Sequence, residues 1–305
     1  MGVVVAVIGI ACVFYIYAFY ALALFIGLAC LYELAQLCER KGQTLEYPVA
    51  VTGVCAYILL AIPDLLHKWE GVLVAGIIIA TFWMGMYGAQ KGYFARTAYT
   101  LLSVLYIGKL LSYFVMIRAV PQSGLLYTLY VIVLIAMTDI SGMLVGSAIG
   151  RHQLSIISPK KTVEGSLGAL LIVSVIGYAA TLYAPLQMQW WQGLILGALT
   201  CIAAQCGDLV ESALKRDAGV KDAGSMIQGH GGVLDRFDSY LFGGMAFFGT
   251  LHLVGILSVP EWRAENAWRF WVPPDRSARR PWKSSPNIPT ALRSPGWPPE
   301  KMLNS

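Results

Sequence analysis

Apolar runs of membrane-crossing length recur along this chain and constrain its fold more than any other feature. An α-helix needs about 20 consecutive, predominantly apolar residues to cross the hydrocarbon core of a bilayer. Residues 3–37 are apolar for long enough to hold two short spans, joined near residues 17–20. Seven further runs occupy residues 47–66, 71–88, 97–117, 124–147, 163–184, 190–207 and 239–258. The sequence therefore predicts nine spans.

The composition supports a membrane protein. Of the 305 residues, 57% are hydrophobic and 13% are charged, whereas soluble domains carry about 25% charged residues. Within a bilayer each backbone polar group must be satisfied inside the protein, and long continuous apolar runs favour helices over the alternating pattern of a barrel. We therefore expect an all-α fold, a polytopic integral membrane protein with about nine transmembrane helices.

Basic residues are concentrated in alternate loops. With nine spans and the N-terminus inside, the opposite loops hold only Lys68 and Arg118. Lys and Arg in short loops favour the cytoplasmic side of a membrane. The cytoplasmic loops hold eleven basic residues, namely Arg40, Lys41, Lys91, Arg96, Arg151, Lys160, Lys161, Lys215, Arg216, Lys221 and Arg236. This bias places the polar loops of the second half of the chain in the cytoplasm.

Three parts of the chain differ in character. Residues 1–123 hold about five spans joined by short loops. Residues 124–258 form a candidate catalytic transmembrane domain, because they hold two polar loops, 148–162 and 208–238. Residues 259–305 form a tail rich in Pro, Arg and Trp, with no helical or strand period. Such a composition predicts disorder for the tail.

Acidic residues lie inside or beside two of the spans. A charged side chain at the centre of a span costs at least about 2.5–3.5 kcal/mol, so it indicates a functional site by default. Asp139 lies deep in an apolar run, and Asp208 and Glu211 follow the end of another. On a helix, Asp208, Glu211 and Ser212 would share one face. The alternative for each acid is a helix cap or a pair with a neighbouring base.

Asp235 and Asp238 repeat the three-residue spacing at the start of the last span. Two pairs of acids that enter from two helix ends could converge on one hard cation. Oxygen ligands without thiols or a histidine cluster suit Mg²⁺, which usually takes one or two protein carboxylates and completes its shell with water and phosphate. The acids therefore indicate a magnesium site and a phosphate-bearing substrate.

The loop between these acids supplies cations and glycines. Lysine and arginine bind phosphate oxygens, although here they also serve as a topology signal. The basic residues are Lys215, Arg216, Lys221 and Arg236. In the run GHGG at 229–232, Gly231 and Gly232 allow the backbone to approach a ligand closely. His230 is either a phosphate donor or acid/base group, or a structural residue.

A second polar segment, SPKKTVEGS at residues 158–166, precedes the seventh predicted span, 163–184. Thr162 is placed to cap the following helix. Ser158, Lys160 and Lys161 would then lie beside the positive N-terminus of that helix, which favours anions. Glu164 is either a capping acid or a residue that orients a lysine. The segment predicts an anion site, with a basic topology loop as the alternative.

The segment SALKRDAGVKDAGSMIQGHGGVLDRFD at residues 212–238 resembles the signature of the phosphatidate cytidylyltransferases, also called CDP-diacylglycerol synthases. That pattern has S-x-apolar-K-R, then K-D, then H-G-G-apolar-x-D-R-apolar-D. Gln228 stands where the family usually has proline. The segments GDLVESALKR and SPKKTVEG are similar to further family motifs in the expected order, whereas TDISGMLVG around Asp139 is a looser match. The resemblance covers about residues 20–258.

The resemblance implies that phosphatidate attacks the α-phosphorus of CTP and yields CDP-diacylglycerol and pyrophosphate. It implies Mg²⁺ as cofactor, with K⁺ as a candidate second cation. By the same resemblance Asp208 and Asp235 are the metal ligands, aided by Ser212. The surrounding basic residues would offset the charge of the triphosphate, and Lys160 and Lys161 would hold a phosphate of either substrate. A phosphate monoester is already anionic near neutral pH, so no general base is needed.

The expected partners follow from this interpretation. They are CTP and phosphatidate as substrates and the lipid bilayer, with no nucleic acid and with a homodimer as a reasonable arrangement. The expected location is a bacterial inner membrane, with the active site on the cytoplasmic side. Two alternatives remain: a CTP-dependent kinase of a polyprenol-like lipid alcohol, which would need a base for its hydroxyl acceptor, and an ion-coupled transporter that uses Asp139 and Asp208.

Overall fold

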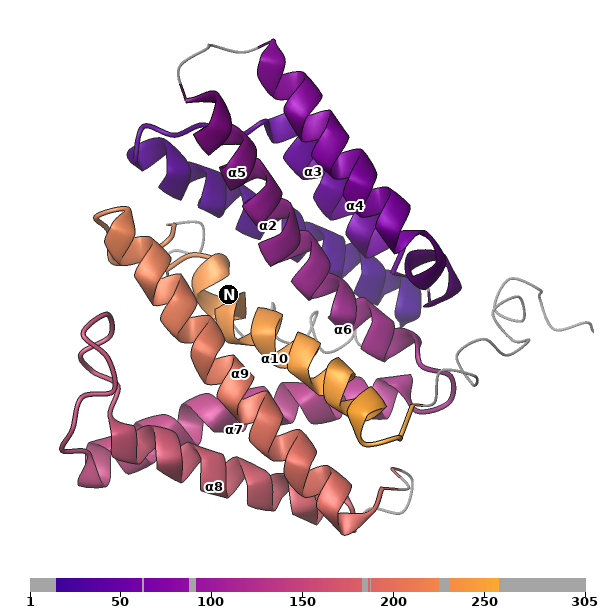
Figure 1. The fold of residues 1–305 in the computed structure, drawn as a ribbon. Coiled ribbons are helices and arrows are strands. Elements are labelled where there is room, and N and C mark those ends of the chain that lie inside the picture. Colours follow the sequence, from indigo (N-terminus) through magenta and orange to yellow (C-terminus); the bar gives the residue numbers. More distant parts are fainter. Residues whose placement is uncertain are drawn as a thin grey trace, which may run out of the picture. The chain divides into compact units, whose positions relative to one another are not determined.

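A computed structural model describes residues 15–61, 63–87, 92–182, 186, 188–224 and 231–257. The tail predicted at 259–305 lies outside the described residues, as do residues 1–14 and His230. The chain divides into two units, Met1–Ala264 and Glu265–Ser305. Every helix below belongs to the first unit (Figure 1).

The described part is helical, which confirms the predicted fold class. Its helices are α2 (Ile16–Arg40), α3 (Tyr47–Leu59), α4 (Pro63–Met86), α5 (Tyr93–Ser103), α6 (Leu110–Ala119), α7 (Gly124–Ile149), α8 (Val163–Ala180), α9 (Trp190–Asp217) and α10 (Leu234–Leu253). A π-helical stretch, η1 (Val104–Lys109), joins α5 to α6, so that Tyr93–Ala119 forms one long helix. A single antiparallel bridge in the described residues pairs Gln153 with Thr162.

The helices have the lengths of membrane spans. Among the described residues, six are long and apolar enough to cross a bilayer: α2, the Lys68–Met86 part of α4, the long helix Tyr93–Ala119, α7, α8 and α9. Helix α3 is apolar but shorter. The chain is therefore a polytopic membrane protein, and the count of nine spans stays a prediction.

Two predicted boundaries differ from the observed ones. The predicted break near residues 17–20 is wrong, because these residues lie inside the continuous helix α2. That segment, YAFY, contains neither Gly nor Pro to interrupt a helix. Conversely, the run predicted at 47–66 is divided, since α3 ends at Leu59 and α4 begins at Pro63. Proline disfavours helical geometry in the residue before it.

Helix α9 is longer than its apolar run. It continues through Asp208 and Lys215 to Asp217, so the polar loop predicted from residue 208 begins only at Ala218. Likewise α10 begins at Leu234 and includes Asp235. The sequence between 208 and 217 is rich in good helix formers. Its acids therefore stand on a rigid helix and not on a loop.

Helices α7 to α10 pack in chain order, α8 between α7 and α9, and α9 against α10 (Figure 1). Two glycines lie in close contact where α8 crosses α9. A Cβ atom added to Gly177 would lie 2.2 Å from the carbonyl oxygen of Gly193, and one added to Gly193 would lie 2.3 Å from that of Gly177. Small residues allow membrane helices to approach this closely. This contact fixes α9, which carries Asp208.

We expect Gly177→Ala to lower the melting temperature of the protein in detergent, because the new methyl group must push the α8 and α9 backbones apart. Gly249→Ala is the control: it is also a substitution within a helix, and nothing lies within 4 Å of its added Cβ. Alanine there should be neutral or stabilising by about 0.5–1 kcal/mol. Equal melting temperatures for the two variants would contradict the close crossing.

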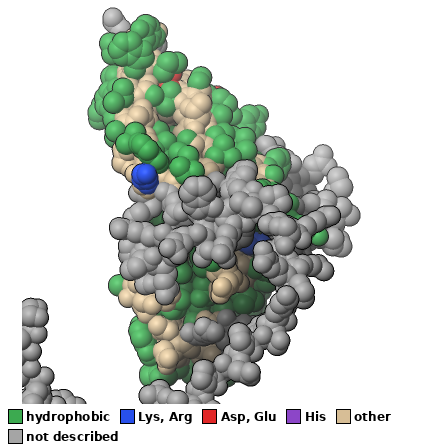
Figure 2. Space-filling model, turned by 90° about the vertical axis from the view of Figure 1, so that its right-hand side faces the viewer, with side chains coloured by type: hydrophobic (Ala, Val, Ile, Leu, Met, Phe, Trp, Pro, Cys, Tyr) green, Lys and Arg blue, Asp and Glu red, His purple; other side chains and the backbone are tan. Residues whose placement is uncertain are grey.

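An ion pair inside the membrane helices attaches α4 to the rest of the protein. Lys109 of η1 pairs with Glu70 of α4, and its ammonium group lies 5.0 Å from the ring centre of Tyr113. Elsewhere α4 exposes large apolar side chains such as Ile79 and Trp83. Figure 2 shows one face of the chain, on which hydrophobic side chains cover most of the described surface and charged ones are few. Such a surface suits contact with lipid.

Three ion pairs join segments that the charge bias predicts to be cytoplasmic. They are Lys41–Asp217, Arg96–Glu46 at 2.9 Å, and Lys161–Asp208. The hydrogen bond to Asp217 raises the pKa of Lys41 above its ordinary value. The predicted cytoplasmic loops therefore meet at one end of the helices.

Candidate active site

The loop between α7 and α8 is held in place by the first turn of α8. The Thr162 hydroxyl accepts a hydrogen bond from the backbone N–H of Gly165 at 3.1 Å, which confirms the predicted cap. The Glu164 carboxylate accepts from the N–H groups of Arg151 and His152 at 3.0 and 3.2 Å. Glu164 was predicted either as a capping acid or as a residue that orients a lysine. These bonds show a third role, in which Glu164 anchors the start of the loop. This anchor determines where the lysines at the end of the loop lie.

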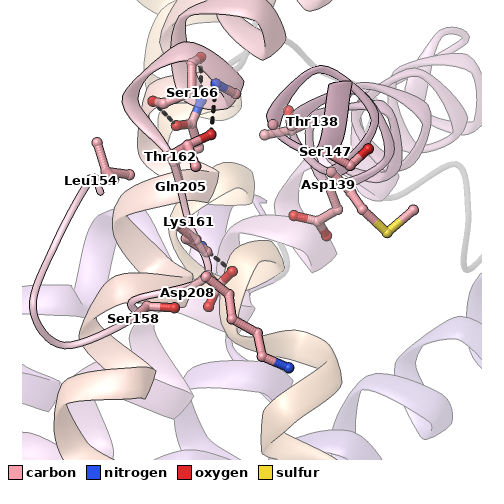
Figure 3. Close-up of a pocket in the computed structure, with 15 residues that line it drawn as sticks. Thr138, Asp139, Ser147, Leu154, Ser158, Lys161, Thr162, Ser166, Gln205 and Asp208 are labelled. Carbon is pink, nitrogen blue, oxygen red and sulfur yellow. Dashed lines mark hydrogen bonds and ion pairs between the residues drawn. The ribbon is translucent and has the colours of Figure 1, made fainter. Parts of the chain in front are cut away.

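A cavity of about 490 Å³ opens between this loop and helices α7, α8 and α9 (Figure 3). Its polar lining combines hydroxyl, amide, carboxylate and ammonium groups. The lining residues include Thr138, Asp139, Ser147, Ser158, Lys160, Lys161, Thr162, Ser166, Gln205 and Asp208. The cavity therefore gathers Ser158, Lys160, Lys161 and Asp208, four residues that the sequence singled out.

Asp208 is the centre of the charged part of the cavity. Its carboxylate pairs with Lys161, and both side chains are 27% exposed. The Ser212 hydroxyl donates to the other Asp208 oxygen at 3.4 Å, as the shared helix face predicts. In Figure 3 Asp139 reaches in from the α7 side, opposite the Lys161–Asp208 pair. The cavity thus offers two carboxylates and two lysines to a ligand.

A second charged cluster lies between α9 and α10. Lys215 contacts Glu211 at 2.5 Å and Asp235 at 2.6 Å. Glu211 is fully buried, while the Lys215 and Asp235 side chains are 13% and 11% exposed. Lys215 therefore bridges two carboxyl groups and joins α9 to the start of α10.

Backbone N–H groups hold the Asp235 carboxylate in a fixed orientation. It accepts from the N–H of Gly232 at 2.7 Å and from that of Ala223 at 3.0 Å. Gly231, which precedes this turn, has φ = +84°, a left-handed conformation that favours glycine. The predicted glycines thus shape the turn that presents Asp235.

The remaining predicted residues lie around this second cluster. Arg216 donates to the backbone oxygen of Val220 at 3.3 Å, so it contacts the loop that follows α9. Lys221 and Arg236 are exposed. Asp238 is buried one turn beyond Asp235 and accepts from the N–H of Ser239 at 2.6 Å.

The oxygen atoms of the cavity are of the type that binds a magnesium ion. In the described ranges no group of three or more His, Cys, Asp or Glu side chains is arranged to hold a metal. Magnesium needs only one or two protein carboxylates, because water and substrate phosphate fill its other positions. Asp208 with Ser212 supplies such oxygens. Asp235, predicted as the second ligand, belongs to the neighbouring cluster with Lys215.

Sequence reasoning missed Glu33 of α2. This carboxylate is only 1% exposed and accepts hydrogen bonds from Val233 and Leu234 at the start of α10. The rule applied to Asp139 and Asp208, that an acid inside a span is costly and indicates function, would have found it. What the sequence does not reveal is its partner, 200 residues away along the chain.

Comparison with known proteins agrees with the resemblance seen in the motifs. A model of the cytidylyltransferase family matches residues 1–254. The phosphatidate cytidylyltransferase of Staphylococcus haemolyticus is 32% identical over 226 residues, which cover 72% of this chain and 86% of that protein. The enzyme of the same name from Bacillus subtilis is 39% identical over 180 residues, 59% of this chain and 66% of that protein. This chain therefore belongs to the cytidylyltransferase family.

Proposed function

We propose that the chain is a phosphatidate cytidylyltransferase, which transfers CMP from CTP to phosphatidate. The observation that carries this proposal is the Lys161–Asp208 pair in a polar cavity between membrane helices. A lipid phosphate and a nucleotide both need cations, and a hard metal ion needs a carboxylate. Relatives named phosphatidate cytidylyltransferase support the choice of lipid substrate.

In the proposed reaction a phosphate oxygen of phosphatidate attacks the α-phosphorus of CTP. The bond from that phosphorus to the bridging oxygen of the β-phosphate breaks, and pyrophosphate leaves with the bond electrons. Lys160, Lys161 and Ser158 hold phosphate oxygens at the cavity, while Lys215 offsets negative charge beside Asp235. Because the nucleophile is already an anion, positioning and charge neutralisation are the main tasks of the protein.

Magnesium is the proposed cofactor, held by Asp208 and Asp235 with Ser212 beside them, and when bound it would neutralise charge on the phosphate oxygens. K⁺ is proposed as a second cation. Arg216, Lys221, Arg236, Gly231 and Gly232 are proposed to contact the nucleotide phosphates. His230 is proposed to join them.

The proposed location is a bacterial inner membrane, with the cavity open to the cytoplasm. Bacterial relatives and the clustering of basic loops at one end of the helices support this orientation. CTP would then reach the site from the cytoplasm and phosphatidate from the bilayer. A homodimer is part of the proposal.

The test uses purified protein in lipid nanodiscs with phosphatidate, Mg²⁺ and CTP labelled separately on the α- and γ-phosphates. We expect the α-label to enter the lipid and the γ-label to leave as pyrophosphate. Removal of Mg²⁺ with EDTA should stop both events, and added Mg²⁺ should restore them.

Other outcomes would replace the proposal. Appearance of the γ-label on an added polyprenol would identify a lipid-alcohol kinase. Ion uptake into vesicles without nucleotide turnover would identify a transporter. Turnover that persists in EDTA would refute the role of the metal while leaving CMP transfer in place.

A further inference from the structure

Three consecutive backbone N–H groups at the start of α10 are bound by two carboxylates. The N–H of Gly232 donates to Asp235, whereas those of Val233 and Leu234 donate to the two oxygens of Glu33, at 2.9 and 2.8 Å. The first N–H groups of a helix have no partner within the helix. Val233, at the N-cap, has an apolar side chain that cannot supply one. Glu33 of α2, which is distant in the sequence, caps α10 instead.

The carboxylate of Glu33 fits between two glycines. A Cβ added to Gly224 would lie 2.5 Å from one carboxylate oxygen, and a Cβ added to Gly232 would lie 2.5 Å from the other. Two backbone segments hold Asp235, because the N–H groups of Ala223 and Gly232 donate to its carboxylate. Gly224 follows Ala223 in the first segment, and Gly232 lies in the second. Glu33 therefore lies against the segments that fix the direction of Asp235.

A charged cap at this depth is costly unless it is compensated. Burial of a carboxylate disfavours its charged form, and here the compensating groups are two N–H donors and the positive end of the α10 dipole. Caps formed by Ser, Asn or Asp next to the helix would satisfy the same N–H groups without a residue from another helix. The arrangement instead couples α2 to the turn that carries Asp235.

We propose that Glu33 is a positioning residue for Asp235: it holds the 231–235 turn, and through that turn the Asp235 carboxylate, in the geometry needed for CMP transfer. The inference rests on the proposed function and adds a residue from the N-terminal half of the chain to the site. Glu33 itself is not proposed to touch either substrate.

The test compares Glu33→Gln with Glu46→Gln in nanodiscs. Glu46 is a matched control, because its carboxylate is also largely buried and pairs with Arg96, outside the cavity and the Lys215 cluster. Glutamine is nearly isosteric, but only one of its two terminal atoms can accept an N–H. We expect Glu33→Gln to lower kcat by about 10- to 100-fold, as loss of a supporting hydrogen bond commonly does, with a smaller change in KM for CTP. Glu46→Gln should keep the wild-type kcat.

Amide hydrogen exchange supplies a readout that does not depend on turnover. A merely local cap would lose protection only at Val233 and Leu234. A positioning residue should also expose the amides of Ala223 and Gly232, which bond to Asp235 and not to Glu33. Wild-type protection at Ala223 and Gly232 in Glu33→Gln would overturn the proposal, as would a kcat per folded molecule within about twofold of wild type. Absence of CMP transfer in the wild-type protein would instead overturn the proposed function.

A second variant keeps the test decisive if Glu33→Gln folds poorly. Gly224→Ala should lower kcat, because its methyl group meets the Glu33 carboxylate. This variant keeps Glu33 itself, so it tests the position of the carboxylate without removing it. A folded Gly224→Ala protein that kept the wild-type kcat and the wild-type protection of the Gly232 amide would overturn the proposal.

Discussion

Replacement of Asp208 by asparagine should reduce CMP transfer by about a hundredfold to a thousandfold, the range seen when a group that stabilises charge in a reaction is removed. Asparagine keeps the size of the side chain and loses its charge, so the proposed Mg²⁺ loses one of its two carboxylate ligands and Lys161 loses its anionic partner. Stability should change by only about 0–1 kcal/mol, because the Lys161–Asp208 pair is partly exposed to solvent. The measurements are transfer of the α-label in nanodiscs and thermal unfolding in detergent.

The control for Asp208→Asn is Glu39→Gln, since Glu39 is an exposed acid at the end of α2. It should keep wild-type turnover and stability. Asp208 would lose its assigned role if Asp208→Asn, shown to be folded, turned over at more than about half the wild-type rate across a Mg²⁺ titration.

Replacement of Lys215 by methionine should have the largest effect on stability. Glu211 is fully buried and Asp235 nearly so, and both depend on the Lys215 ammonium group. Removal of one partner from a buried ion pair typically costs about 3–5 kcal/mol, because the other charge stays buried without compensation. We expect Lys215→Met to unfold well below the wild-type melting temperature and to lack turnover.

A double variant separates folding from catalysis at this cluster. Glu211→Met combined with Lys215→Met replaces the buried Glu211–Lys215 pair with apolar groups, a change that is often neutral or stabilising. Asp235 keeps its two backbone N–H donors but loses its cation. The double variant should therefore unfold at a higher temperature than Lys215→Met and below the wild type, without regaining turnover. Recovery of turnover in the double variant would show that Lys215 serves stability alone.

Several elements could be predicted because their causes are local. Thr162 caps α8 through a bond that spans three residues, and Ser212 meets Asp208 one helical turn away. The apolar runs predict the helices because the bilayer requires a minimum length of apolar helix. The basic segment at 158–161 and Asp208 were predicted separately as parts of a site. The opposite charges of Lys161 and Asp208 explain why they meet.

Glu211 was predicted as a member of a ligand face or as a neighbour of a base, and its pairing with Lys215 one turn away, which is also local, is the second of these. Other elements depend on contacts that no short segment encodes. The bridge that Lys215 makes to Asp235 requires the packing of α9 on α10. Glu33 is the clearest example, because its two partners belong to a helix that lies at the other end of the described chain.

The long separation between Glu33 and its partners has a consequence for biosynthesis. Helix α2 leaves the ribosome before α10, and the N–H groups that bind Glu33 follow 200 and 201 residues after it. Until α10 is in place, α2 carries an acid whose partners do not yet exist. The cost is smaller than the roughly 2.5–3.5 kcal/mol of a charge at the centre of a span, because Glu33 lies nearer the C-terminal end of α2. Transfer of its apolar neighbours Cys30, Leu31 and Leu34 out of water offsets this cost. Helix α2 therefore reaches its final environment only when α10 arrives, and a chain truncated before α10 would leave Glu33 without its two N–H donors and so become a target for quality-control proteolysis.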